Sequence, residues 1–324
     1  MPSPSQIAAS RLARCTQPKP RWRVTIRPST SRLYMRAYFN RGIFLETDPV
    51  LIPPNSARHY AEQIIYLPHS HQINDPATVL TSMPVERKTC ELPESGFIFC
   101  CLNSNHKITP TTFESWMRIL KKVEGSTLWL LEDNAEAASN LRQAAHAQGI
   151  SPHRLVFAKR TGLAEHLSRQ GLADLFLDTW PYGAHTSASD ALWAGLPLLT
   201  CVGESFASRV EASLLTALDL PELIANSPAE YEQLAIELAK NVVKFQSIKD
   251  RLLTNRHSAP LFQTTVTVRH IETAYTTIVE RVRQNLAPQS ISIRDAEDDL
   301  DQAAPRMAQL HKQIKPINRH QRAE

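Results

Sequence analysis

Short apolar runs alternate with amphipathic stretches through the middle of the chain. The runs are too short for helices and are bounded by polar or turn-forming residues, which favours strands, whereas apolar positions three or four apart favour helices. We expect strands at 97–103, 128–131, 155–158, 172–177 and 196–201, and helices at 111–123, 135–148, 163–170, 187–194 and 206–218. This alternation predicts an α/β fold with a parallel sheet covered by helices on both faces.

Two of the predicted helices carry the spacing of a capping box at their start. Thr111 stands three residues before Glu114, and Ser187 stands three residues before Asp190. In such a box the first side chain accepts a hydrogen bond from the backbone of the fourth residue. We therefore expect these helices to begin at Thr111 and Ser187.

Residues 178–197 combine a strand end, a small-residue loop and a helix start rich in hydroxyl groups. The free N–H groups and the dipole of such a helix start favour an anion. His185, Thr186 and Ser187 could donate to phosphate oxygens, and Asp190 could accept from ribose hydroxyls. The residues alone fit equally well an ordinary capped helix that follows a core strand.

Composition and charge narrow the class of protein. The chain has 324 residues, 42% of them hydrophobic, and no apolar run near the length of about 20 residues that a membrane helix needs. Residues 1–45 hold nine Lys or Arg and no acidic residue, which leaves 27 basic against 32 acidic residues elsewhere. The main body therefore lacks the excess of positive charge that is typical of nucleic-acid-binding proteins. We expect neither nucleic-acid nor membrane partners.

The five cysteines show no spacing of a metal site or a disulfide framework. Cys100 and Cys101 lie inside a predicted strand, which favours reduced core thiols in a cytoplasmic protein. The histidines at 59, 69, 71 and 106 lie in predicted loops without metal-ligand spacing. Arg209 lies early in a predicted helix, which suggests an anionic partner. Trp180 and Tyr182 border the 178–197 loop, where they could stack on a ligand or pack against a neighbouring loop.

A collinear set of motifs from about residue 48 to residue 283 resembles one family. The motifs are Asp48-Pro-Val-Leu-Ile-Pro-Pro54, Tyr60-Ala-Glu-Gln-Ile-Ile-Tyr-Leu-Pro68, Gln72-Ile-Asn-Asp75, Phe97-Ile-Phe-Cys-Cys-Leu-Asn103, His106-Lys-Ile108, Ser205-Phe-Ala-Ser-Arg-Val210, Leu220-Pro-Glu-Leu-Ile224 and Pro260-Leu-Phe262, together with 178–197. In order and spacing they resemble the catalytic region of protein O-linked N-acetylglucosamine transferases and their Spindly-type relatives. The resemblance implies a GT-B-type glycosyltransferase, represented mainly by its C-terminal Rossmann-like half.

The resemblance also implies a reaction and a set of contacts. The reaction is transfer of N-acetylglucosamine from UDP-GlcNAc to Ser or Thr of a protein acceptor, without metal or other cofactor. Lys107 is the implied catalytic residue, which neutralises charge on the leaving UDP. The implied UDP contacts are Asn103, Lys107, Arg160, Thr161, His166, His185, Thr186, Ser187 and Asp190. Leu163 stands where some relatives carry a lysine.

We divide the chain into four parts on this basis. Residues 1–45 are expected to be a disordered or disrupted basic segment, with a transit peptide or an anion-binding arm as other possibilities. Residues 46–95 are expected to be a remnant of the acceptor-side half, 96–283 the UDP-sugar-binding domain, and 284–324 a flexible charged tail.

The acceptor side of the sequence matches the family least. No repeat of about 34 residues is visible, and no His-Pro motif matches the acceptor-side histidine of relatives. We therefore expect UDP binding with transfer near background, and we keep a non-catalytic UDP-binding or interaction module as the alternative function.

Overall fold

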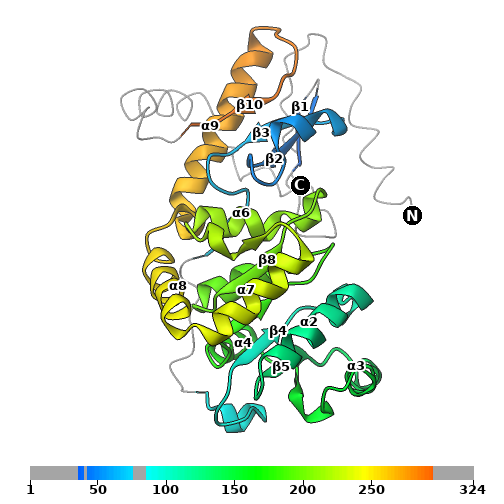
Figure 1. Cartoon of the computed structure of the whole chain (residues 1–324). Coiled ribbons are helices and arrows are strands. Elements are labelled where there is room, and N and C mark those ends of the chain that lie inside the picture. The colour runs from blue at the N-terminus through cyan, green and yellow to red at the C-terminus, as the bar shows by residue number, and fades with distance from the viewer. Residues whose placement is uncertain (1–35, 40–41, 76–84, 295–324) are drawn as a thin grey trace, which may run out of the picture.

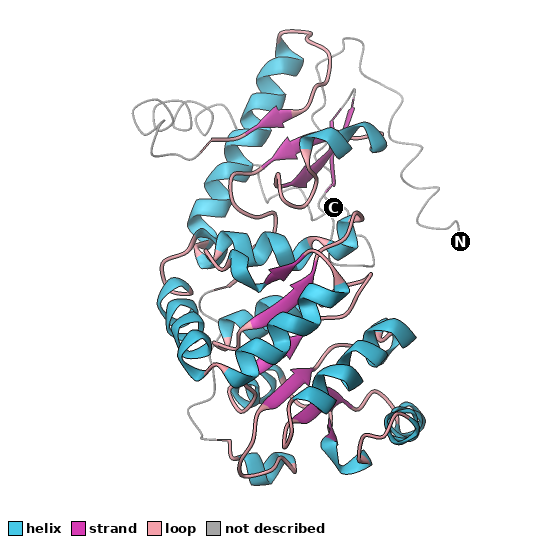
Figure 2. Ribbon diagram, in the orientation of Figure 1, coloured by secondary structure: helices cyan, strands magenta, loops and turns pink. Residues whose placement is uncertain are grey.

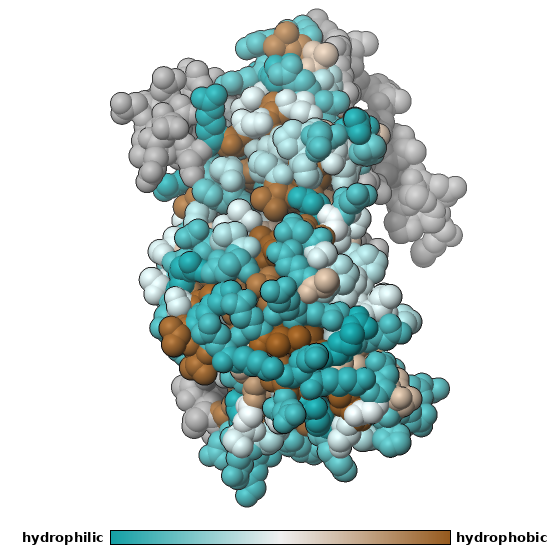
Figure 3. Space-filling view, viewed as in Figure 1, coloured by the Kyte–Doolittle hydropathy of each residue, from teal (hydrophilic) through white to brown (hydrophobic). Residues whose placement is uncertain are grey.

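The computed structural model describes residues 36–39, 42–75 and 85–294. Two sheets are built from these residues, one of six strands and one of four. Figure 1 and Figure 2 show the six-stranded sheet with its helices in the lower part of the view and the small sheet above it, beside a long helix. No helix in these ranges combines the length and apolar character that crossing a membrane requires. Figure 3 shows hydrophilic side chains over most of one face.

The six-stranded sheet is parallel in every pairing. Its strands are β4 (Ile98–Cys101), β5 (Thr127–Leu131), β6 (Leu155–Ala158), β7 (Leu175–Leu177), β8 (Leu198–Cys201) and β9 (Ile224–Ala225). The order β6-β5-β4-β7-β8-β9 reverses direction between β4 and β7. In doubly wound sheets ligands bind at such a switch point, beyond the carboxyl ends of the strands. The predicted parallel sheet is confirmed.

The helices pack their apolar faces on this sheet. They are α2 (Pro110–Lys122), α3 (Ala135–Ala147), α4 (Leu163–Gln170), α5 (Thr186–Trp193), α6 (Val210–Ala217), α7 (Pro228–Lys240) and α8 (Val242–Asn255). Trp116, Trp129 and Tyr231 are fully buried in the core. The Trp116 indole donates to the Tyr231 hydroxyl at 3.2 Å, and that hydroxyl donates to the Asp178 carbonyl at 3.0 Å. The core therefore braces the end of β7.

Both predicted capping boxes are wrong. Helix α2 begins at Pro110, and the Thr109 side chain accepts from the Thr112 backbone at 3.2 Å. Proline is well suited to the first helical position, because its missing N–H would be unpaired there. Helix α5 begins at Thr186 after His185, which has φ 54° and makes no side-chain capping bond. The helix expected at 206–218 is divided between a 3₁₀ turn, Phe206–Ser208, and α6.

The small sheet joins segments from both ends of the chain. Strands β1 (Arg36–Phe39) and β2 (Gly42–Thr47) are antiparallel, and β3 (Gln63–Tyr66) lies parallel to β2 and to β10 (Ile291–Ser292). Helix α9 (Thr264–Arg283) packs on this sheet in a cluster made by Phe44, Ile65, Leu67, Ile271, Ala274 and Ile278. Strand β2 crosses the boundary expected at residue 45, and β10 lies beyond the one expected at 283. Residues 1–35 and 295–324 lie outside the described residues.

Candidate functional site

A cavity of about 330 Å³ lies at the carboxyl ends of the strands, at the predicted binding edge. Leu102 and Ser104 after β4 and Leu131 at the end of β5 form part of its wall. Four of the expected UDP contacts also line it, namely Arg160, Thr161, His166 and Ser187, together with Leu163. Three separate loops and two helix starts therefore meet at one cavity.

Asp133 connects the loops that surround this cavity. Its Oδ2 accepts from the Asn105 backbone at 2.6 Å, and its Oδ1 contacts the Arg160 guanidinium at 2.5 Å. Asn105 follows β4, Asp133 follows β5 and Arg160 follows β6. The Arg160 side chain is 67% exposed, so its guanidinium is accessible to a ligand at the cavity mouth.

His166 presents a neutral imidazole to the cavity. Burial, aided by the charges of Arg169 and Arg160, lowers the pKa of His166 to about 4. Its Nδ1 lies 3.0 Å from the Arg169 guanidinium. Because that guanidinium can only donate, Nδ1 accepts and Nε2 carries the proton. His166 Nε2 is therefore a hydrogen-bond donor for an uncharged polar group of a ligand.

Lys107 contacts the 178–197 loop through its ammonium group. It ends a 3₁₀ turn, Asn105–Lys107, and its Nζ donates to the Gly183 carbonyl at 2.7 Å. The same Nζ lies 4.1 Å from the centre of the Tyr182 ring. Burial lowers the pKa of Lys107, against the opposing effect of Asp178 and Glu211. Lys107 therefore places a partly desolvated cation beside the start of α5.

His185 is buried, and the hydrogens on its nitrogens are already engaged. Its backbone N–H donates to Glu211 Oε1 at 2.5 Å, and its Nε2 lies 3.0 Å from the Ala207 carbonyl. A carbonyl only accepts, so Nε2 carries the proton and Nδ1, which has no partner among the described residues, carries a lone pair. Burial lowers the pKa of His185 to about 4. In this arrangement the ring N–H is engaged by the Ala207 carbonyl, and the expected donation to phosphate would require that bond to break.

Thr186, Ser187 and Asp190 remain open to a ligand in different degrees. Thr186 is exposed and Ser187 lines the cavity, both in the first turn of α5. Asp190 lies one turn further along, and burial raises the pKa of its carboxyl to about 6. No residue in the described part of the chain donates a hydrogen bond to that carboxyl. It is not in the cavity wall, although it shares a helix face with Ser187.

Asn103 turns into the protein rather than toward the cavity. Its Nδ2 donates to Thr179 Oγ1 at 3.2 Å, and its Oδ1 accepts from the Ser104 backbone at 3.0 Å. Thr179 Oγ1 in turn donates to the Tyr182 carbonyl at 2.8 Å. Among the expected UDP contacts, Asn103 therefore holds the 178–197 loop in place and does not face the cavity.

Two buried acids support this loop, and sequence reasoning missed one of them. Asp178 accepts from the Thr179 and Ala184 backbones and from Thr200 Oγ1, and burial raises its pKa to about 6. Glu211 on α6 is fully buried, and burial raises its pKa well above its ordinary range. A side chain at position 183 would collide with the Glu211 carboxyl. The signal was an acidic residue among apolar positions of an otherwise buried helix.

The remaining loop residues have structural partners. Trp180 packs edge-on against Tyr231, with ring centres 4.7 Å apart, and Tyr182 packs edge-on against His185 at 4.8 Å. Arg209 donates to the Val50 carbonyl at 2.7 Å and to the Gly203 carbonyl at 2.9 Å. Its expected anionic partner is therefore replaced by two carbonyls. Among the described residues, no group of three or more His, Cys, Asp or Glu side chains is placed to hold a metal ion.

Comparison with known proteins identifies relatives of this chain. The family model described as Glycosyl transferase family 41 matches residues 77–271. The chain is 38% identical to a probable UDP-N-acetylglucosamine–peptide N-acetylglucosaminyltransferase SEC of Arabidopsis thaliana, over 72% of this chain and 24% of that protein. It is 36% identical to the UDP-N-acetylglucosamine–peptide N-acetylglucosaminyltransferase of Caenorhabditis elegans, over 54% of this chain and 15% of that protein. The chain thus spans a quarter or less of these relatives.

Solved structures share the fold. A mutant of Thermobaculum terrenum O-GlcNAc transferase aligns with a TM-score of 0.65 and 26% identity, over 72% of this chain and 44% of that one. Sucrose-phosphate synthase of Thermosynechococcus elongatus aligns with a TM-score of 0.52 and 13% identity, over 73% of this chain and 58% of that one, which bears on the fold alone. The predicted GT-B-type α/β fold is confirmed.

Proposed function

Because the chain belongs to glycosyl transferase family 41, we propose that it binds a UDP-sugar at the carboxyl edge of its six-stranded sheet. We propose UDP-GlcNAc as the donor and Ser or Thr hydroxyls of a protein as the acceptor, as the names of the relatives suggest. The observation that carries the proposal is the meeting of Arg160, Thr161, His166 and Ser187 at one cavity.

The uridine occupies the cavity in this proposal, and the diphosphate points toward α5 and Lys107. The neutral His166 suits the uncharged polar edge of the base, because its Nε2 can donate without a charge. The start of α5 suits an anion, because its free N–H groups and dipole attract negative charge. Lys107 adds a full positive charge from the opposite side of the loop.

Transfer requires the bond between the anomeric carbon and the diphosphate to break. Negative charge then grows on the leaving UDP, and a cation placed there beforehand stabilises that charge more in the transition state than in the substrate. Partial burial strengthens the effect, because the interaction is screened less than in water. Lys107 has this role in the proposal, and no metal or other cofactor takes part.

A cytoplasmic location also belongs to the proposal. Cys90, Cys100, Cys101 and Cys201 are all free thiols, and three of the four are buried, as expected of a protein kept in a reducing compartment.

Calorimetry with UDP, followed by transfer from labelled UDP-GlcNAc to a peptide library, tests the function. We expect binding to UDP and slow transfer to Ser- or Thr-containing peptides. Binding without any transfer would support the alternative of a non-catalytic UDP-binding module. Absence of UDP binding would refute both.

A further inference from the structure

His71 lies in the loop after β3, in a position that the donor-site motifs did not indicate. Its Nδ1 is 3.7 Å from Asp48 Oδ2, and the two side chains are 8% and 0% exposed. Its ring packs edge-on against Phe206, with ring centres 5.7 Å apart. The ring is therefore held by a carboxylate on one side and an aromatic side chain on the other.

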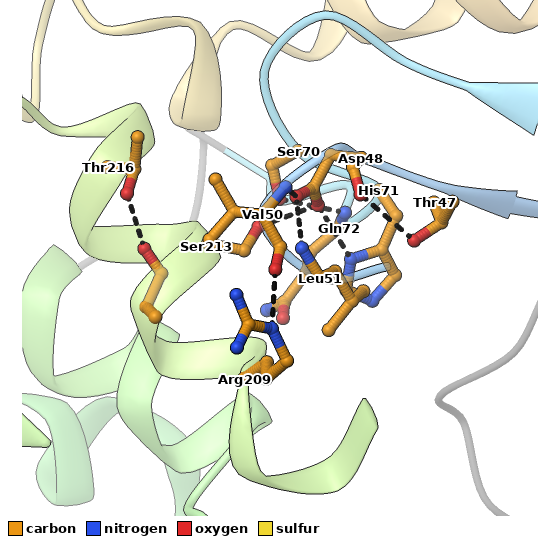
Figure 4. Close-up of polar contacts among 11 residues, drawn as sticks. Thr47, Asp48, Val50, Leu51, Ser70, His71, Gln72, Arg209, Ser213 and Thr216 are labelled. Carbon is orange, nitrogen blue, oxygen red and sulfur yellow. Dashed lines mark hydrogen bonds and ion pairs between the residues drawn. The ribbon is translucent and has the colours of Figure 1, made fainter. Parts of the chain in front are cut away.

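Asp48 is fixed in place by three donors. Its Oδ1 accepts from the backbones of Val50 and Leu51 at 3.0 and 2.9 Å, and its Oδ2 accepts from Ser213 Oγ at 2.7 Å. Figure 4 shows these contacts, with His71 and Asp48 on the blue segment and Ser213 on α6. A carboxylate held in this way can set the orientation of an imidazole beside it.

The loop that carries His71 is attached directly to the helix at the proposed diphosphate site. Asn74, three residues after His71, accepts from Ser189 on α5 at 2.6 Å. Phe206, which His71 contacts, is followed by Ala207, whose carbonyl holds both the Gly183 backbone at 3.1 Å and His185 Nε2 at 3.0 Å. His71 and His185 thus flank one short segment, residues 206–207.

The two ring nitrogens of His71 have different surroundings. Nδ1 is buried and lies 3.7 Å from Asp48 Oδ2 without forming a hydrogen bond, so Nε2, on a different edge of the ring, points away from that carboxylate. A proton on Nδ1 is attracted by the carboxylate, which leaves a lone pair on Nε2. An imidazole oriented in this way accepts a proton from a hydroxyl group, as in triads of Ser, His and Asp.

We propose that His71, oriented by Asp48, is the base that accepts the proton of the acceptor hydroxyl during sugar transfer. The inference rests on the proposed function. The hydroxyl oxygen forms a bond to the anomeric carbon, and the bond from that carbon to the diphosphate oxygen breaks, with its electron pair leaving on UDP. The hydroxyl proton passes to His71 Nε2 and is later lost to water. Asp48 is a positioning residue in this scheme.

If His71 is the base, transfer exceeds the near-background rate expected from the sequence. That expectation depended on the absence of a matching histidine from the acceptor side of the sequence. His71 comes from that side, but it has no motif of its own, and only the fold brings it beside Asp48 and the start of α5.

The test measures donor binding and single-turnover transfer in three variants of the full chain. His71→Gln keeps a polar side chain but removes the base, and His59→Gln changes an exposed histidine in an earlier turn as a matched control. We expect His71→Gln to lower the single-turnover rate by about 10²- to 10⁴-fold, with UDP affinity within about twofold of wild type. In His71→Gly, added imidazole should restore part of the rate.

The outcomes separate this inference from the proposed function. A wild-type rate in His71→Gln would overturn the inference, as would a loss of UDP affinity equal to the loss of rate, or a wild-type chain that binds UDP without any turnover. Failure of imidazole to restore His71→Gly would also count against it, because a structural defect would not respond to a soluble base. If the wild-type chain does not bind UDP, the proposed function itself fails.

Discussion

Burial determines the protonation of the side chains around the proposed donor site. It lowers the pKa values of His166 and His185 to about 4, so both rings are neutral at pH 7. Burial also raises the pKa of Glu211 well above its ordinary range. Lys107, whose Nζ donates to the Gly183 carbonyl, can supply positive charge beside the 178–197 loop. The motif in the sequence predicts a role for Lys107, but it could not predict which histidines stay neutral, because that depends on tertiary burial.

Lys107→Ala tests this distribution of charge. We expect UDP binding to weaken by about 1.5–3 kcal/mol, the range for a hydrogen bond to a charged group, whereas uridine without phosphates should bind as before. Calorimetry with both ligands measures the difference. Lys121→Ala, which removes an exposed lysine at the end of α2, is the control. Equal affinity for UDP in wild type and Lys107→Ala would exclude a contact with the diphosphate.

Asp190→Ala tests the predicted ribose contact. Because α5 begins without a capping box, Asp190 does not cap the helix, and its loss should not weaken the start of α5. We expect weaker binding of UDP and unchanged binding of pyrophosphate, which lacks ribose. If UDP and pyrophosphate both bind more weakly, Asp190 acts through the shape of the helix rather than through a contact with the ribose.

The same variant has a pH signature. The pKa of Asp190 is about 6 in the folded chain and near its ordinary value of about 4 when unfolded. Between these values the folded state binds more protons than the unfolded state, so this group contributes stability at low pH that is lost as the pH rises through 6. Thermal melts should show wild type losing stability relative to Asp190→Ala between pH 4 and pH 7. A constant difference would contradict the raised pKa.

At the scale of elements, the sequence predicted the core well and the helix starts poorly. Strand β6 and helix α4 have the predicted bounds, because apolar residues and turn-forming residues mark both ends. The starts of α2 and α5 were wrong, since Pro110 and the left-handed His185 decide them. Strand β10 pairs with β3 through two pairs of residues that lie more than 200 positions apart in the sequence. No local sequence pattern predicts this pairing.

Gly183→Ala tests the packing of the 178–197 loop on α6. A Cβ at this position would collide with the Glu211 carboxyl, and overpacking of this kind costs about 1–3 kcal/mol. We expect a lower free energy of unfolding and weaker UDP binding, because the carbonyl of residue 183 holds Lys107. Gly171→Ala is the control, since its new Cβ would make only ordinary contact. Denaturant unfolding of the two variants measures the difference, and equal stability would mean that Glu211 moves aside easily.

At the scale of the molecule, α6 joins the small sheet to the six-stranded sheet. Arg209, immediately before α6, donates to Val50, Ser213 on α6 donates to Asp48, and Glu211 between them accepts from His185. The segment that follows β2 thus contacts the same turn of helix that supports the 178–197 loop. The domain boundaries drawn from the sequence missed this junction, because Arg209 and Ser213 find their partners more than 150 residues away.

Arg209→Ala tests whether this junction positions the acceptor side. The variant removes donors from the Val50 and Gly203 carbonyls, which should lower the free energy of unfolding by about 1–3 kcal/mol. Arg209 does not line the cavity proposed for uridine, so UDP affinity should stay near wild type. Transfer should fall, because Asp48 and His71 lose a fixed position relative to α5. Arg283→Ala at the exposed end of α9 serves as the control. Equal losses of UDP binding and transfer would mean that Arg209 supports only the proposed UDP site. Loss of transfer alone would show that the position of the small sheet limits catalysis.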